Sequence, residues 1–262
     1  MVDFSQDFKG KRVVVTGAAG IFGGWIAKAF AKAGAELLLT DADRDRLAAA
    51  AQEIGEGHQQ HVADLTSDAD IKSLLSTIAE RWGAADVLVN NAGIYPSGFL
   101  LDLTAEDWDR IFDINLRAPF LLSQGVALQM IGKGVKGSIV NISSGASRKM
   151  RTTVVPYCTS KTALDRLNKG LALELAEFGI RVNIVEPGFA PGSDVSHLTQ
   201  EHIDSVVGNI PLGRISSPDD AATAVLYLAS DAAAYVTGAT LTVDGGNSIG
   251  SLAVFQAKKK AL

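Results

Sequence analysis

The sequence predicts an α/β fold, in which one domain is built on a Rossmann-type, doubly wound parallel sheet of about seven strands with helices on both faces. Short, almost continuously apolar runs alternate with longer amphipathic stretches along the chain. Such runs are typical of parallel strands buried on both faces, and right-handed crossovers through the helices then wind the sheet in both directions. No linker or low-complexity stretch interrupts the alternation, so residues 1–262 are predicted to form a single domain.

The strands are predicted where β-branched and other apolar residues follow one another for a few positions. In chain order, we expect strands at 12–16, 36–40, 61–63, 86–90, 138–143, 181–186 and 240–243. The helices are predicted where apolar residues recur every three or four positions. We expect them at 23–32, 43–54, 68–82, 105–130 as one or two helices, 155–178 and 219–230.

Residues 188–211 form the longest segment without strong periodicity. A segment of this kind in a compact domain is often a functional lid, so we predict a substrate lid there. The alternative is a surface insertion without a role in binding.

Composition excludes several classes of protein. The chain has 262 residues, of which 47% are hydrophobic, and a net charge of −5, which argues against a nucleic-acid surface. Cys158 is the single cysteine, so internal disulfides are excluded and a reducing compartment is expected. Neither a signal peptide nor an apolar run of about 20 residues is recognised, so we expect a cytoplasmic protein without a membrane partner.

Tyr157 and Lys161 are the most informative residues. They lie four positions apart in the predicted helix 155–178, so their side chains share one face. A phenol beside an ammonium group is an acid/base pair, because the cation favours the phenolate and is expected to lower the tyrosine pKa from about 10 toward neutrality. The alternative is a surface pair, since this spacing is common by chance. Ser144, thirteen positions before Tyr157, ends the apolar run 138–143.

A glycine-rich turn joins the first predicted strand to the first helix. Glycines let the backbone approach a pyrophosphate closely, and a helix N-terminus adds unpaired N–H groups and a favourable dipole. The strand–turn–helix context therefore predicts dinucleotide binding. The turn consists of Gly17, Ala18, Ala19, Gly20, Ile21, Phe22 and Gly23.

Together these motifs resemble the classical, NAD-dependent short-chain dehydrogenase/reductase family over nearly the whole chain. The resemblance implies that Tyr157 is the acid/base, that Lys161 lowers its pKa and holds the nicotinamide ribose, and that Ser144 hydrogen-bonds the substrate oxygen. Asn115 resembles the asparagine that positions a water in a proton relay. Ser143 is the rival of Ser144, but only Ser144 has the family spacing. Hydride transfer with proton transfer needs such an acid/base, and donors for the developing alkoxide.

The glycine turn departs from the family pattern Thr-Gly-x-x-x-Gly-x-Gly. Its middle glycine, Gly20, comes one place early, and Ile21 occupies the usual glycine position. The spacing resembles that of the family's extended branch, whereas the length and the other motifs are classical.

Asp41 follows the second predicted strand and is expected to select NAD. Its carboxylate can accept the ribose hydroxyls and would repel a 2′-phosphate, and Ala42 stands where phosphate-preferring relatives often have arginine. We interpret Arg44 and Arg46 as solvated. The alternative role for Asp41, a helix N-cap, is compatible with ribose binding.

The resemblance implies further cofactor contacts after later strands. Asp64 and Leu65 resemble the adenine contact, although a capping role for Asp64 is an alternative. Gly192 stands where the family often has threonine, and Ser193 is a candidate substitute. The other implied contacts are Asn91, Ala92, Gly93, Pro187, Gly188, Phe189 and Ala190, together with Tyr157 and Lys161.

The loop 145–155 is predicted to border the substrate, together with Ser144 and Tyr157. It carries Arg148, Lys149 and Arg151, and such cations bind carboxylates, phosphates or sulfonates. The alternative is a solvated basic loop. Other candidates for the pocket are Tyr95, Phe99, Phe189 and His197. No metal site is predicted, and Cys158 is expected to be packed.

These features predict an NAD-dependent oxidoreductase acting on a secondary alcohol or sugar hydroxyl, with an acidic sugar or hydroxy acid favoured by the basic loop. The alternative is a 3-oxoacyl thioester reductase, although those enzymes usually prefer NADPH, which Asp41 opposes. A remote alternative is a non-catalytic, dinucleotide-sensing regulator. The resemblance, apolar residues on several faces of 155–178 and the apolar stretch 249–255 predict a homotetramer.

Overall fold

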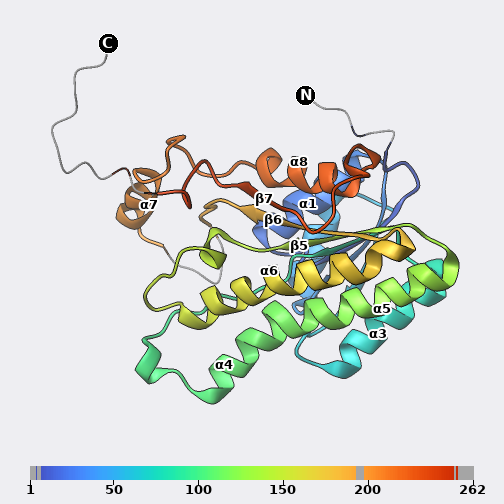
Figure 1. The fold of residues 1–262 in the computed structure, drawn as a ribbon, viewed down its shortest axis with the longest axis horizontal. Helices are drawn as coiled ribbons and strands as arrows, with labels where there is room; N and C mark the ends of the chain where they lie inside the picture. The colour runs from blue at the N-terminus through green and yellow to red at the C-terminus, as the bar shows by residue number, and fades with distance from the viewer. Residues whose placement is uncertain (1–3, 5–6, 193–197, 251, 253–262) are drawn as a thin grey trace, which may run out of the picture.

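A seven-stranded parallel sheet forms the centre of the molecule (Figure 1). The computed structural model describes residues 4, 7–192, 198–250 and 252. The strands lie in the order β3-β2-β1-β4-β5-β6-β7, so the chain winds outward first in one direction and then in the other. Their bounds are β1 Arg12–Thr16, β2 Glu36–Asp41, β3 Gln59–Val62, β4 Val87–Asn90, β5 Ser138–Ile142, β6 Arg181–Pro187 and β7 Thr240–Val243. The direction reverses between β1 and β4, the place where doubly wound sheets bind ligands.

Helices cover both faces of the sheet (Figure 1). Helices α1, α2 and α8 pack on one face, and α3, α5 and α6 pack on the other. The bounds are α1 Ile21–Lys32, α2 Arg44–Ile54, α3 Asp68–Trp82, α4 Ala105–Phe112, α5 Ala118–Lys133, α6 Val155–Leu175, α7 Gln200–Val207 and α8 Pro218–Ala229. Within the described residues, no helix is both long enough and apolar enough to span a membrane.

The alternation of side chains along each strand explains the two cores. Val13 and Val15 of β1 contact the core beneath α1 and α8, whereas Val14 contacts the core beneath α3 and α5. All three valines are fully buried. An apolar run in the sequence is therefore what a strand covered on both sides requires.

The predicted α/β fold is confirmed, and most differences are at the ends of elements. The predicted helix 105–130 is divided by a π-helical turn, η2 Asp113–Arg117, between α4 and α5. Helix α7 was not predicted, although Thr199 caps it by accepting a hydrogen bond from the His202 backbone N–H at 3.2 Å. It lies inside the proposed lid 188–211, of which residues 193–197 are outside the described part.

The parallel arrangement brings the carboxyl ends of all strands to one edge. Register pairs Thr16 of β1 with Thr40 of β2 and Asn90 of β4 with Asn141 of β5, so these ends are level. The residues that follow these strands therefore lie at the same edge of the sheet, although those after β1 and those after β5 are more than a hundred positions apart in the chain.

Candidate active site

The glycine turn forms in spite of its altered spacing. Gly17 has φ +63°, and a Cβ atom there would lie 2.8 Å from the Ala92 Cα; at Gly23 a Cβ would lie 2.0 Å from the Gly17 carbonyl oxygen. Asn91 Nδ2 donates to the carbonyl oxygens of Thr16 at 2.9 Å and Gly17 at 3.0 Å. The turn therefore packs directly on the segment after β4.

The N-terminus of α1 is suited to an anion. Gly20 is the N-cap and Ile21 the first helical residue, so the family's glycine position is occupied by a residue with ordinary helical geometry. Within α1, every residue of which is described, the first turn has no acidic residue and no side-chain cap. Its N–H groups and dipole fit the pyrophosphate of a dinucleotide.

Asp41 lies against this turn. Its Oδ2 accepts the Ala19 N–H at 3.1 Å, and its Oδ1 accepts the Asp43 N–H at 3.3 Å. The alternative that Asp41 caps α2 is wrong, because Asp43 is the cap and accepts from the N–H groups of Asp45 and Arg46 at 3.0 Å. Arg46 was interpreted as solvated, but its Nη2 donates to the Ala19 carbonyl at 3.3 Å. Asp41 thus binds the N–H group of Ala19 in the turn, and Arg46 binds the carbonyl group of the same residue.

Asp64 and Leu65 follow β3 at the same edge. Asp64 is exposed and its Oδ1 accepts the N–H and the hydroxyl of Thr66, both at 2.9 Å, whereas Leu65 is buried. The alternative that Asp64 caps α3 is wrong, because Ser67 caps that helix and accepts the Asp70 N–H at 3.3 Å. Asp64 shapes the turn and leaves an acceptor at the surface.

Ser144, Tyr157 and Lys161 come together at this edge, between β5 and α6. The Ser144 side chain acts on the Tyr157 phenol by hydrogen bonding, which lowers the pKa of that phenol. Lys161 is almost fully buried, and its Nζ donates to the Ile142 carbonyl at 2.9 Å and lies 5.9 Å from the centre of the Tyr157 ring. Ser143 points elsewhere, because its hydroxyl is directed at the Lys161 carbonyl at 3.5 Å.

Burial dominates the protonation of this group. It raises the pKa of Tyr157, and this effect exceeds the lowering by the Ser144 hydrogen bond and by the charge of Arg151. In the protein without a cofactor, the net direction is therefore opposite to the expected lowering of the Tyr157 pKa, and the effect of Lys161 on it stays a prediction. Lys161 is itself desolvated, which lowers its own pKa to about 8.

Asn115 lies in the π-helical turn and is fully buried. Its Oδ1 accepts the Ile94 N–H at 2.9 Å, and its Nδ2 donates to the Ile94 carbonyl at 2.9 Å and to the Ser160 hydroxyl at 3.1 Å. The side chain joins the segment after β4 to the catalytic helix. Its part in a proton relay stays a prediction.

The substrate loop places its two arginines differently. Arg148 donates through Nη2 to Glu186 Oε2 at 2.6 Å, and 48% of its side chain stays exposed, so it is paired rather than wholly solvated, and its contact with a substrate stays a prediction. Arg151 is exposed, and its charge lowers the pKa of Tyr157. Cys158 is buried and packed, as expected.

Two loops meet beside Tyr157. The Thr153 backbone has φ +64°, a left-handed conformation unusual for a β-branched residue, and its carbonyl accepts the Gly98 N–H at 2.8 Å. The segment that contains Gly98 also carries Tyr95, whose ring centre lies 5.8 Å from that of Tyr157. Phe99 on the same segment is mostly exposed.

The end of β6 is closely packed. A Cβ atom at Gly188 would lie 2.8 Å from the Ser216 hydroxyl oxygen and 2.9 Å from the Asp244 Cα, and the Phe189 carbonyl accepts the Ser216 N–H at 2.8 Å. Ser193 and His197 lie outside the described residues.

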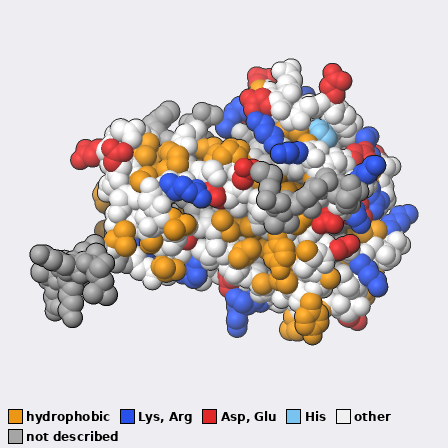
Figure 2. Space-filling model, turned by 90° about the horizontal axis from the view of Figure 1, so that it is seen from above, with side chains coloured by type: hydrophobic (Ala, Val, Ile, Leu, Met, Phe, Trp, Pro, Cys, Tyr) orange, Lys and Arg blue, Asp and Glu red, His pale blue; other side chains and the backbone are white. Residues whose placement is uncertain are grey.

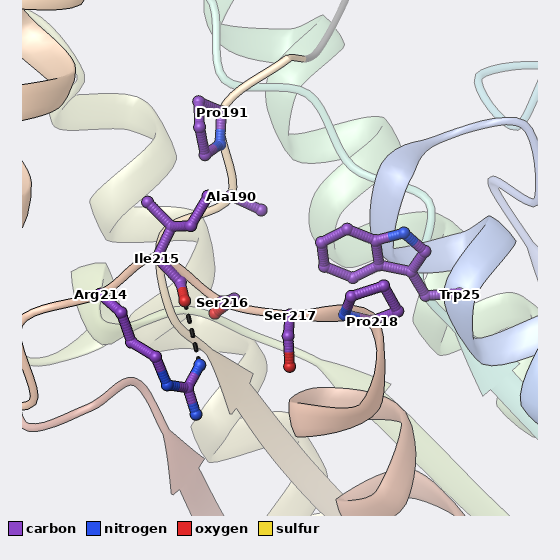
Figure 3. A pocket seen from close by; sticks show the side chains of 8 residues that line it. All are labelled: Trp25, Ala190, Pro191, Arg214, Ile215, Ser216, Ser217 and Pro218. Carbon is purple, nitrogen blue, oxygen red and sulfur yellow. Dashed lines mark hydrogen bonds between the residues drawn. The ribbon is translucent and has the colours of Figure 1, made fainter.

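A pocket beside Ala190 contains residues that sequence reasoning missed (Figure 3). Trp25 and Pro218 form one side, and Ala190, Pro191 and Ile215 form the other; Arg214, Ser216 and Ser217 complete it. A tryptophan one turn into the helix that follows a glycine-rich turn was the signal that could have revealed it.

The chain matches a family model described as enoyl-(acyl carrier protein) reductase over residues 17–248. It is 34% identical over 248 residues to galactitol 2-dehydrogenase from Agrobacterium fabrum, with 90% of this chain and 97% of the relative covered. It is 35% identical over 240 residues to a 3-oxoacyl-(acyl-carrier-protein) reductase from Rickettsia conorii, covering 92% and 98%. The chain belongs to the short-chain dehydrogenase/reductase family.

A solved structure agrees. Gluconate 5-dehydrogenase from Burkholderia cenocepacia, in complex with NADP and tartrate, has a TM-score of 0.86 at 31% identity, with 95% of this chain and 98% of that one covered. The protein is therefore an oxidoreductase that acts on a CH–OH group with a nicotinamide dinucleotide. The uncapped helix N-terminus and the glycine turn that a Cβ would fill fit this cofactor.

Proposed function

We propose that this protein is an NAD-dependent dehydrogenase of a secondary alcohol or sugar hydroxyl, with a carboxylated, phosphorylated or sulfonated sugar or hydroxy acid as its preferred class of substrate. The observation that carries the proposal is that buried Lys161 lies 5.9 Å from the Tyr157 ring centre, next to the end of β5 where Ser144 stands, at the sheet edge where α1 begins without a side-chain cap.

The chemistry follows from the two hydroxyl groups. When bound, the dinucleotide supplies the acceptor for the hydride that leaves the substrate carbon. The hydroxyl of Ser144 donates a hydrogen bond to the substrate oxygen, and ionised Tyr157 takes the proton from that oxygen as the ketone forms. Lys161, buried against the Ile142 carbonyl, is placed to stabilise the phenolate and to contact the nicotinamide ribose. Asn115 would position a water through which the proton leaves.

Asp41 supports NAD as the cofactor. Its carboxylate lies on the glycine turn at the end of β2, where it would accept ribose hydroxyls and repel a phosphate. Arg46 contacts the same turn, and the Burkholderia relative binds NADP, so the ratio of kcat/KM for NAD to that for NADP tests this preference. The other proposed contacts are Gly17, Gly20, Ile21, Phe22, Gly23, Asp64, Leu65, Asn91, Ala92, Gly93, Pro187, Gly188, Phe189 and Ala190.

Arg151 supports an anionic substrate. It is exposed, and its charge acts on the phenol of Tyr157, so an anionic group on a substrate held by Tyr157 is within its field. Tyr95 offers an aromatic face on the same side, suited to the C–H face of a sugar. The relative that binds tartrate holds a hydroxy acid of this class. Arg148, which is paired with Glu186 through Nη2 but is 48% exposed, is the second proposed contact.

Initial rates of dinucleotide reduction test the proposal. The purified protein would be assayed with NAD and with NADP on polyols, neutral sugars, sugar acids, sulfonated sugars and hydroxyacyl thioesters. We expect the highest kcat/KM for an acidic sugar or hydroxy acid with NAD. A neutral best substrate would reject the anionic class, and a thioester preferred with NADP would favour the 3-oxoacyl reductase, which the Rickettsia relative supports. No turnover with any class would favour the regulator.

We also propose a homotetramer, located in the cytoplasm. Leu128 on α5 and Leu173 on α6 are exposed by 65% and 81%, so an apolar face of these helices is left without cover in one chain. Tyr227 and Tyr235, at α8 and just after it, are also exposed, and Figure 2 shows patches of apolar side chains between the charges of the face seen from above. Light scattering decides this, because a mass near 27.5 kDa would reject any oligomer and a dimer would reject the tetramer.

A further inference from the structure

Glu186 is a buried carboxylate at the end of β6, one residue before Pro187. It is 1% exposed, and both of its oxygens are hydrogen-bonded. Oε1 accepts the hydroxyl of Ser147 at 2.5 Å, and Oε2 accepts Arg148 Nη2 at 2.6 Å and the hydroxyl of Thr242 at 2.8 Å. A buried carboxylate is costly unless it is paired and fully hydrogen-bonded, so this arrangement is specific to its partners.

The partners of Glu186 belong to two segments. Ser147 and Arg148 follow β5, and Thr242 is in β7. Arg148 Nη2 also donates to the hydroxyls of Thr242 at 2.6 Å and Ser248 at 3.0 Å, which adds the turn after β7. That turn packs closely, because a Cβ atom at Gly145 would lie 2.9 Å from the Ser248 Cβ.

Ser144 is the first residue of the segment that Glu186 holds. It is the N-cap of the 3-10 turn η3 Gly145–Ser147, and its Oγ accepts the Ala146 N–H at 3.2 Å. The turn is one unit, because the Ser147 N–H donates to the Ser144 carbonyl at 2.9 Å. Glu186 fixes the far end of this unit through Ser147 and Arg148, and Ser144 begins it.

We propose that Glu186 is a positioning residue for the Ser144 hydroxyl, acting through the η3 turn. The proposal rests on the role of Ser144 given under the proposed function. Without the carboxylate, Arg148 and Ser147 lose their shared acceptor, and the hydroxyl of Ser144 is no longer held at one place relative to Tyr157. Misplacement of a donor by about 1 Å costs up to about 100-fold in rate.

A double-mutant cycle tests the coupling, with E186Q, S144A and the double variant in the full-length protein. Glutamine keeps the shape of glutamate and removes the charge. We expect E186Q to lower kcat by about tenfold and to leave the Kd for the dinucleotide within about twofold. In the S144A background, E186Q should change the residual kcat by less than about twofold, because the group that it positions is absent.

A matched control is D86N, which breaks the Arg12–Asp86 ion pair at the opposite edge of the sheet. Asp86 is half-buried and accepts two side-chain bonds from Arg12, at 2.7 and 3.0 Å. We expect D86N to lower Tm and to leave kcat unchanged in both backgrounds. If E186Q behaves in the same way, Glu186 has only a structural role.

The outcomes separate this proposal from the proposed function. If S144A keeps wild-type kcat, Ser144 is not the donor to the substrate oxygen, and the positioning role of Glu186 is rejected as well. If S144A loses turnover but E186Q lowers kcat by the same factor in both backgrounds, only the positioning role is overturned. Should E186Q not fold, S147A removes one hydroxyl from Glu186 and keeps the ion pair. It is expected to lower kcat by a smaller factor that also disappears in the S144A background, and equal factors would overturn the proposal.

Discussion

The cofactor half and the substrate half of the sheet edge are built in different ways. At the cofactor half, Gly17 and Gly23 allow a close approach of the backbone, and the Asn91 side chain donates to the carbonyl groups of Thr16 and Gly17. At the substrate half, side chains from distant segments decide the arrangement. Two arginines three positions apart have different surroundings, since Arg148 is paired with buried Glu186, whereas Arg151 is exposed and its charge lowers the pKa of Tyr157. A local glycine motif packed on the segment after β4 therefore defines the first half, and side-chain contacts between distant segments define the second.

The largest expected effect is the loss of kcat when the acid/base Tyr157 is replaced, because the reaction needs both the cofactor half and the substrate half. Tyr157→Phe should lower kcat by about 10³-fold or more, because general acid–base catalysis contributes roughly 10²–10⁴-fold. The Kd for NAD, measured by calorimetry, should change by less than about threefold, because only the phenolic proton is removed. Near-normal turnover in a clean preparation would reject Tyr157 as the acid/base.

The next prediction tests the substrate half. Arg151→Ala should raise the substrate KM by about tenfold or more with little change in the KM for NAD, because a charge-assisted hydrogen bond contributes about 1.5–3 kcal/mol. Lys149→Ala removes a cation from the same loop and is the matched control, with no change expected. Arg148→Ala should lower Tm, because it leaves the buried Glu186 without its cation. If all three variants raise the substrate KM equally, the loop acts only through its total charge and Arg151 makes no specific contact with the substrate.

The cofactor half is tested by Asp41→Ala. We expect the ratio of kcat/KM for NAD to that for NADP to fall by roughly tenfold, because the carboxylate no longer binds ribose hydroxyls or repels the phosphate. Asp43→Ala is the control, because Asp43 caps α2 two residues away and its loss should affect Tm alone. An unchanged ratio in Asp41→Ala would show that Asp41 does not contact the ribose.

The smallest effect concerns pH and Lys161. Its pKa is lowered by burial from 10.5 to about 8, so between these values the unfolded chain binds a proton that the folded protein does not. Stability of the wild type should therefore rise with pH from about 8 to about 10.5 relative to Lys161→Met. Thermal unfolding of both proteins across this range measures the difference. A difference in Tm that stays constant would show that Lys161 is not desolvated in the folded protein.

The sequence was sufficient for the fold because the periodicity of apolar residues is set by burial on one or two faces of an element. It was also sufficient to bring Ser144, Tyr157 and Lys161 together, since a strand end and one helix face are local geometry. The sequence did not decide whether Asp41 or Asp43 caps α2, because an aspartate is a favourable N-cap at either position. Only the hydrogen bonds in the folded protein distinguish them. Glu186 was a signal left unused, an acid at the end of an apolar strand.

The sequence by itself determined the alternation of strands and helices, the glycine turn at α1 and the spacing of Tyr157 and Lys161, because each depends on residues that are close along the chain. Only the tertiary structure decided three features. These are the raised pKa of Tyr157, the pairing of Arg148 but not Arg151 with Glu186, and the pocket lined by Trp25. Desolvation, ion pairing and packing depend on groups brought together from distant positions, such as Arg148 and Glu186, and no local pattern contains that information.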